Sequence, residues 1–230
     1  MSNNTRTVSA KNKQVRFYSS YVNFTVLEKS MRAETIDEFT NRWGITVAQF
    51  ENLADYISLE DLYIKISLLG ILDVEEFLKD VFEKPRKFKG DYWCKLLKQQ
   101  SKITFPSFIE KIGSCWLYNI NQKTSIIIPK NIRLVESGNL SNINETVSIK
   151  INKGVEAFGS RCFSNLYVKN IHIKFPETVK YIGNFCFTDN EYLPKVTMSK
   201  NIECGKNVFC NHFNGWKITN IKDKYELNYV

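Results

Sequence analysis

The cysteine and histidine residues near the C-terminus are the first candidates for chemistry. Cys204, Cys210 and His212 are side chains of the kind that bind zinc. Their C-x5-C-x-H spacing matches no common zinc site, and a fourth ligand is missing. The six cysteines include no CxxC pair, and without an export signal we interpret them as reduced thiols. The sequence therefore predicts no metal site and no cofactor.

A catalytic site needs a nucleophile beside a base, a set of metal ligands or a loop that holds phosphate. The chain has two histidines, His172 and His212, and contains no P-loop, GxGxxG, HExxH or GxSxG motif. Acid pairs such as Asp37 and Glu38 cannot share one site, because adjacent side chains diverge. We therefore predict that the protein is not an enzyme.

The net charge of +8 is unevenly distributed along the 230 residues. Residues 1–33 carry six Lys/Arg and one Glu, whereas residues 34–82 carry three Lys/Arg and eleven Asp/Glu. No apolar stretch is long enough for a transmembrane helix and no signal peptide is recognisable, so we expect a cytoplasmic protein without a membrane segment. The abundance of Asn, Lys and Ile is typical of a low-GC genome, and we interpret it as a bacteriophage or low-GC bacterial origin.

Repeated segments occupy the C-terminal half. Each has a short alternating run that can bury one face of a strand, then a turn, a glycine and a closing aromatic residue or Leu. Because one unit cannot bury its apolar face alone, the units must stack into a solenoid. The five segments are 103–117, 126–140, 149–163, 173–187 and 196–209.

The glycines of these segments are expected at a corner of each coil, in a backbone conformation that a side chain would forbid. They are Gly113, Gly138, Gly159, Gly183 and Gly205, with spacings of 25, 21, 24 and 22 residues.

An aromatic residue four positions after the glycine should point inward and stack on its equivalent in the next coil. Phe163, Phe187 and Phe209 hold this position, and Trp116 and Leu117 fill the same place in the first unit. The second unit looks degenerate, since Leu140 follows its glycine by only two residues. The three cysteines of the corresponding turns are interpreted as packing residues: Cys115, Cys162 and Cys186.

The pattern resembles the irregular leucine-rich repeats of the bacterial surface antigen type, whose units read roughly IP-x-x-V-x-x-IG-x-x-AF. The best matches are Phe175-Pro-Glu-Thr-Val-Lys-Tyr-Ile-Gly-Asn-Phe-Cys-Phe187 and Phe105-Pro-Ser-Phe-Ile-Glu-Lys-Ile-Gly113. The resemblance covers about half of the chain, and it implies a surface for binding rather than catalysis.

Residues 34–100 show helix signals. Thr35 to Glu38 and Thr46 to Gln49 are capping boxes, and Ser58 to Asp61 is a looser third. A further helix is expected from Asp73 to Phe82, and another from Asp91 to Gln99.

Residues 36–53 also resemble a helix-turn-helix, with Thr40 four residues before a turn at Gly44. The second helix would then place Gln49 and Asn52 where they could contact adenine edges. It carries no Arg or Lys to hold phosphates and lies in an acidic block, so a plain structural helix pair is the other interpretation. Nucleic acid, if bound, would contact the phosphate-binding candidates Arg6, Lys11, Lys13, Arg16, Lys84, Arg86, Lys87 and Lys89.

Together these patterns predict an α+β chain: a basic arm at 1–33, a small helical domain at 34–100, and a solenoid of about five irregular leucine-rich repeats at 101–230. The helices should cap the first repeat, and residues 216–230 should form a closing strand. We expect another protein as the partner, bound through solvent-facing strand residues Lys150, His172, Lys174 and Thr197. A regulator that binds nucleic acid is the alternative.

Overall fold

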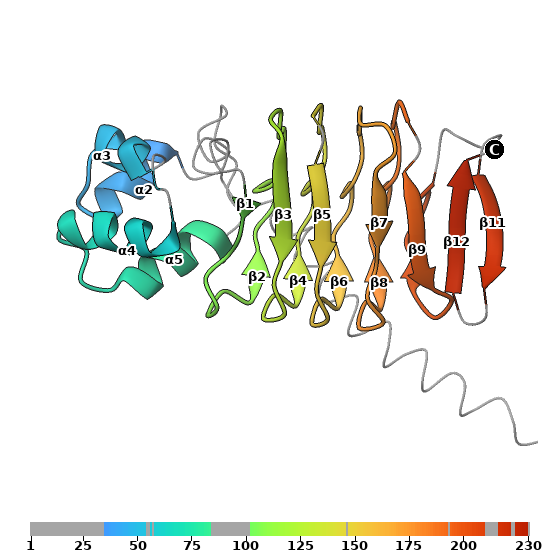
Figure 1. The fold of residues 1–230 in the computed structure, drawn as a ribbon. Coiled ribbons are helices and arrows are strands. Elements are labelled where there is room, and N and C mark those ends of the chain that lie inside the picture. Colours follow the sequence, from blue (N-terminus) through green and yellow to red (C-terminus); the bar gives the residue numbers. More distant parts are fainter. Residues whose placement is uncertain are drawn as a thin grey trace, which may run out of the picture. The chain divides into compact units, whose positions relative to one another are not determined.

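The computed structural model describes residues 35–53, 56, 58–83, 102–145, 147–192 and 194–209, and the backbones of two further strands at 216–221 and 224–229. These residues all belong to one compact unit, Ala33–Val230. Described helices come first and described strands follow (Figure 1). The helices are α2 (Ile36–Arg42), α3 (Val47–Asn52), α4 (Leu59–Leu68) and α5 (Val74–Glu83).

These helices begin where the sequence predicts. Thr35, Thr46 and Ser58 each accept a hydrogen bond at 3.1 Å from the backbone N–H three residues further on. Asp73 does the same for α5 at 2.9 Å. Each cap pairs one of the N–H groups that a helix leaves without an intrahelical partner, so the predicted capping residues are confirmed.

Aromatic packing and one buried carboxylate hold the helices together. The ring of Phe39 lies 5.2 Å from that of Phe50 and 5.8 Å from that of Phe77. The fully buried carboxylate of Asp80, on α5, accepts hydrogen bonds from the Trp43 indole at 2.7 Å and from Arg42. Because Arg42 ends α2, this ion pair fixes α2 against α5.

The strands form a repeat solenoid in which each coil supplies a long-strand position and a short-strand position (Figure 1). The long-strand positions are β1 (Lys102–Ile103), β3 (Thr124–Ile128), β5 (Val147–Ile151), β7 (His172–Lys174) and β9 (Lys195–Ser199). The short ones are β2 (Lys111–Ile112), β4 (Leu134–Val135), β6 (Ala157–Phe158), β8 (Tyr181–Ile182) and β10 (Glu203–Cys204). All pairings between successive coils are parallel, which confirms the predicted helical region followed by a solenoid.

The register of the short strands corrects the alignment of the second repeat. Ile112 pairs with Val135, which pairs with Phe158, and the series continues through Ile182 to Cys204. The residues that follow them are therefore equivalent: Gly113, Glu136, Gly159, Gly183 and Gly205. Gly138 was wrongly placed in this series, and the second repeat is not degenerate, since Leu140 follows Glu136 by four residues.

The reason for the glycines is also different from the one predicted. Gly159 and Gly183 do not have a positive φ, but a Cβ on Gly183 would lie 2.5 Å from the backbone of Gly159 and Ser160 in the preceding coil. These glycines are needed because neighbouring coils approach closely. The left-handed conformation occurs two residues later in each coil, at Cys115, Gly138, Arg161, Phe185 and Asn207, with φ between 54° and 74°.

The predicted aromatic stack is confirmed in the solenoid core. The rings of Phe163 and Phe187 are parallel at 5.4 Å, and those of Phe187 and Phe209 at 5.2 Å. In the first two coils the same position holds Leu117 and Leu140, both fully buried. The row therefore runs the length of the described repeats.

The first coil is covered by α5. The backbone N–H of Gly113 donates to the carbonyl of Phe82 at 2.8 Å, whereas the equivalent N–H of Glu136 donates to the preceding coil. The Phe82 ring also packs at 4.8 Å on that of Trp116. The end of α5 thus takes the place of a missing coil, as expected of a cap on a solenoid.

At the other end, residues predicted to form one closing strand form a hairpin. Strands β11 (Trp216–Ile221) and β12 (Lys224–Tyr229) pair antiparallel, and β12 also pairs antiparallel with β9. The hairpin occupies the backbone hydrogen-bonding groups of β9, which would otherwise form an open sheet edge.

Candidate functional site

The long strands present one face to the core and the other to solvent. Burial alternates along β3, β7 and β9, as the pleat of a strand requires. Inward residues such as Ile126, Ile173 and Val196 are fully buried. The opposite side chains form a surface that we call the long-strand face: Lys102, Ser125, Ile127, Ser148, Lys150, His172, Lys174, Lys195, Thr197 and Ser199.

The structure brings the four predicted partner-binding residues together on this face. Lys150, His172 and Lys174 are exposed, and Thr197 is half-buried. Lys174 pairs in register with Thr197, and the His172 Nε2 lies 2.8 Å from the Thr197 Oγ1. The ring of His172 is therefore held along the sheet by a neighbour in the next coil.

Two lysines of the same face were not named from the sequence. Lys195 is exposed and pairs in register with His172, and Lys102 is exposed on β1. The signal was available, because both residues precede an apolar residue in the same alternating run. Without the register, however, the sequence did not show that they share a face with Lys150 and Lys174.

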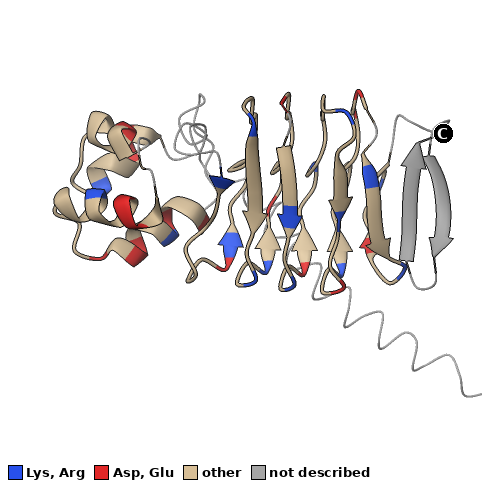
Figure 2. Ribbon diagram, in the orientation of Figure 1, with Lys and Arg blue, Asp and Glu red and all other residues tan. Residues whose placement is uncertain are grey.

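The long-strand face is basic. It carries the four lysines and His172, and no Asp or Glu occupies an outward position in the described residues of these five strands. Figure 2 shows blue segments on β5 and β9. Like charges on neighbouring strands repel each other, so this surface is arranged to attract negative charge.

The short strands have a different arrangement of charge. Glu156 accepts hydrogen bonds from the Arg133 Nη2 at 2.6 Å and from the Lys180 Nζ at 3.1 Å, so it bridges two coils. Burial alone would raise the pKa of Glu156, but these two hydrogen bonds and their positive charges hold it below its usual value. The positive charges of Arg133 and Lys180 are therefore compensated within the solenoid.

In the second coil, the position that is a glycine in the other coils holds Glu136. Glu136 is 2% exposed, its Oε1 lies 3.0 Å from the Lys111 Nζ, and its other oxygen accepts from the Ser114 hydroxyl at 3.2 Å. Both partners belong to the preceding coil. Glu136 thus joins the first two coils through an ion pair.

The cysteines divide into two groups. Cys162 and Cys186 are buried before the stacked phenylalanines, and their thiols donate to carbonyls of the preceding coil at 3.3 and 3.1 Å. Both are therefore packing residues, as predicted, and burial raises the pKa of the Cys186 thiol well above its ordinary value. Cys115 was wrongly grouped with them, because it occupies the exposed left-handed position of its coil.

The zinc candidates are only partly described. Cys204 is exposed on β10, while Cys210 and His212 lie outside the described residues. Within the part of the chain that the structure covers, no three His, Cys, Asp or Glu side chains gather as a metal site would require.

Of the nucleic-acid candidates, only Gln49 and Asn52 lie among the described residues. Gln49 and Asn52 are exposed on α3, which is six residues long. The Gln49 Oε1 accepts from the Thr46 backbone N–H at 2.8 Å, so its carbonyl is used in the capping box. The basic candidates in 1–33 and 84–89, and the helix expected at 91–99, lie outside the described residues.

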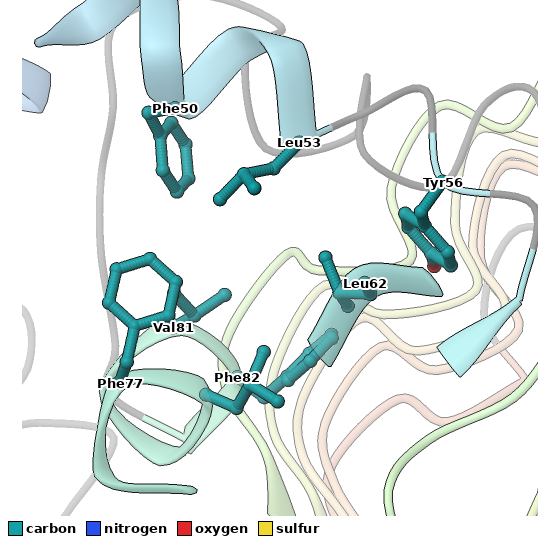
Figure 3. Close-up of a pocket in the computed structure, with 8 residues that line it drawn as sticks. Phe50, Leu53, Tyr56, Leu62, Phe77, Val81 and Phe82 are labelled. Atoms are coloured by element: carbon teal, nitrogen blue, oxygen red, sulfur yellow. The ribbon is translucent and has the colours of Figure 1, made fainter. Parts of the chain in front are cut away.

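A small cavity lies in the helical core (Figure 3). Its volume is about 10 Å³, which is close to the space of one water molecule. Its walls are apolar side chains of three helices and their connections, and burial raises the pKa of Tyr56 there to about 12. The cavity is therefore a packing void rather than a ligand site.

A family model matches the solenoid. It describes the BspA-type leucine-rich repeat region, in six copies over residues 90–214, so it begins upstream of the first repeat recognised in the sequence. Comparisons with curated proteins and with solved structures gave no significant match. None of the described helices has the length and apolar character needed to cross a lipid bilayer. Since the match covers more than half of the residues, this chain belongs to the BspA-type leucine-rich repeat family.

Proposed function

We propose that the chain is a non-enzymatic protein-interaction module that holds an acidic segment of a partner protein on its long-strand face. Membership of a leucine-rich repeat family supports a protein-interaction role in general. We infer from the arrangement of charge in the solenoid that the partner segment is acidic and that it binds on this face.

The observation that carries the proposal is the contrast between the two strand faces. Directly before the short strands, Glu156 compensates Arg133 and Lys180 with ion pairs of 2.6 and 3.1 Å. On the long strands, Lys150 and Lys174 stand on neighbouring coils, and none of these five strands carries an outward Asp or Glu among its described residues. Strands β5 and β7 are neighbours in the solenoid, and like charges on neighbouring strands repel, so an acidic partner would relieve the repulsion between these lysines.

The neutral residues of the face favour a protein over nucleic acid. Ser125, Ser148 and Thr197 offer hydroxyl groups, and Ile127 adds an apolar contact. The described part of this face has no Phe, Tyr or Trp, the side chains on which single-stranded bases stack. A flat surface of lysines, hydroxyls and one aliphatic residue suits an extended acidic peptide.

The test is nuclease-treated affinity purification of the tagged chain, followed by mass spectrometry and measurement of the dissociation constant for the purified partner. The variant K150S/K174S/K195S removes the central lysines of the face. If each lysine contributes about 0.5–1 kcal/mol, binding should weaken roughly 10- to 150-fold. Binding of the unaltered chain should also weaken as salt is raised.

The matched control is K130S/K153S/K206S, which removes the same charge from positions in the turns. The control should retain the partner. Equal losses in both variants would refute a defined site and leave only the net charge. A preparation that carries nucleic acid and loses its partners after nuclease treatment would refute the protein-interaction proposal.

A further inference from the structure

A second surface, on the helices, is separate from the long-strand face. Ile64, Leu68 and Leu72 are 55%, 79% and 99% exposed. The other large apolar residues exposed in the described part of the chain reach only 38–41%. We call these three residues the α4 stripe. Scattered exposed apolar residues are ordinary, but three within one short segment form a patch of the kind used in protein contacts.

The stripe lies on the side of α4 that faces away from the core. Ile64 and Leu68 are four residues apart and share one face of the helix. Leu62 and Ile66, two residues before each, are rotated by about 200° and are buried against the other helices. Helix α4 is therefore apolar on opposite sides, whereas a helix at an ordinary surface carries polar residues on its outer side.

The end of α4 extends the stripe into the following loop. Gly70, with φ of +81°, terminates the helix, and Leu72 follows with its side chain almost fully exposed. Asp73 then caps α5. Packing within the helices does not require a leucine at position 72, since that side chain contributes almost no buried area.

Acidic residues surround the stripe. Glu60 precedes Ile64 by one helical turn, and Asp73, Glu75 and Glu76 follow Leu72; all four are exposed. Figure 2 shows red segments at the beginnings of α4 and α5. The nearest lysine in α4, Lys65, lies 3.4 Å from Asp61, so its charge is compensated locally.

We propose that the α4 stripe binds an amphipathic helix of a partner protein whose leucine-type residues are flanked by Lys or Arg. Ile64 and Leu68, four residues apart on α4, belong to one ridge of the kind that fits between the ridges of another helix. The acidic rim determines the sign of the partner's flanking charges. A symmetric dimer through this stripe would bring two acidic rims together, and the like charges would oppose it.

The first experiment measures binding of two labelled helical peptides to the full chain by fluorescence anisotropy. Both peptides carry the same leucine face, one with lysines beside it and the other with glutamates. The lysine peptide should bind the unaltered chain, and the glutamate peptide should bind at least about tenfold more weakly. Equal affinity for the two peptides would overturn the proposed role of the acidic rim.

Variants then locate the binding. I64S/L68S/L72S should weaken binding of the lysine peptide by at least about tenfold. Its fold should be retained, because these side chains are exposed. E60Q/E75Q/E76Q should weaken binding several-fold and reduce its salt dependence. The matched control I127S removes an apolar side chain from the long-strand face and should leave the peptide affinity unchanged.

The outcomes separate this proposal from the one on the long-strand face. The variant K150S/K174S/K195S should retain the lysine peptide, whatever it does to the acidic partner. Unchanged affinity in I64S/L68S/L72S would overturn the second site alone. Concentration-dependent dimers that disappear in I64S/L68S/L72S, measured by light scattering, would replace the partner helix by a second copy of the chain.

Discussion

Replacing Gly183 with alanine tests whether close packing between coils explains the glycines of the repeat. The added Cβ would lie 2.5 Å from the carbonyl carbon of Gly159 and from the backbone nitrogen of Ser160. Ordinary contacts of this kind are 3.4–4 Å long, so the two coils must move apart by about 1 Å. Since both contacts are backbone atoms, no side chain can rotate to make room.

The expected loss is at the upper end of the overpacking range, about 3 kcal/mol. For a unit of this size, that loss lowers the midpoint of thermal unfolding by roughly 6–12 °C. The measurement is thermal unfolding followed by circular dichroism, with urea unfolding as a second measure of the free energy.

The matched control is Gly70→Ala at the end of α4. Gly70 has φ of +81°, but no atom lies within 4 Å of the place that an added Cβ would take, so it tests conformation without crowding. A left-handed alanine costs about 1 kcal/mol, so the midpoint should fall by roughly 2–4 °C. If Gly70→Ala destabilised the protein as much as Gly183→Ala, the packing explanation would be refuted.

Three further predictions follow from buried or paired groups. Arg42→Met should lower the free energy of unfolding by about 2–3 kcal/mol, measured with urea, because it removes a cation that pairs with the buried carboxylate of Asp80 while the Trp43 indole still donates to it. Glu156→Gln should lower the free energy of unfolding by about 1 kcal/mol at pH 7. Because the folded-state pKa of Glu156 is lowered, that difference should be present above the unfolded-state pKa and disappear as the pH falls through the folded value. Exposed Cys115 should react with a thiol reagent at pH 8 far faster than Cys186, whose pKa is raised by burial; equal rates would contradict the described burial.

Local signals in the sequence predicted the helices well. The caps Thr35, Thr46 and Ser58 were predicted from a Glu, Gln or Asp three residues later. Each of the three hydroxyl groups accepts a hydrogen bond from the backbone N–H of that later residue. A cap involves only four consecutive residues, so no knowledge of the tertiary fold is needed. The ion pair between Arg42 and Asp80 joins residues 38 positions apart, and no local pattern indicated it.

The second repeat was misaligned because glycine serves two purposes in this solenoid. Gly159 is a glycine because the neighbouring coil leaves no space for a Cβ, whereas Gly138 adopts a left-handed backbone. In the second coil the position equivalent to Gly159 holds Glu136. Gly138, two residues later, was therefore mistaken for the equivalent of Gly159. The sequence does not distinguish the two kinds of glycine, and only the strand register does.

The candidate binding face was only half predictable for a related reason. Alternation along each strand is a local property, and it correctly placed His172 and Lys174 on the solvent side. Whether a lysine has a carboxylate beside it depends on residues about 23 positions away, in the coil on either side. The sequence does not distinguish Lys180 from Lys174. In the structure, Lys180 forms an ion pair with Glu156, whereas Lys174 lies on the long-strand face among lysines and hydroxyl side chains. In a solenoid, the chemistry of a face is therefore set by the exact period of the repeat, because a slip of one residue moves a side chain to the opposite side of the sheet.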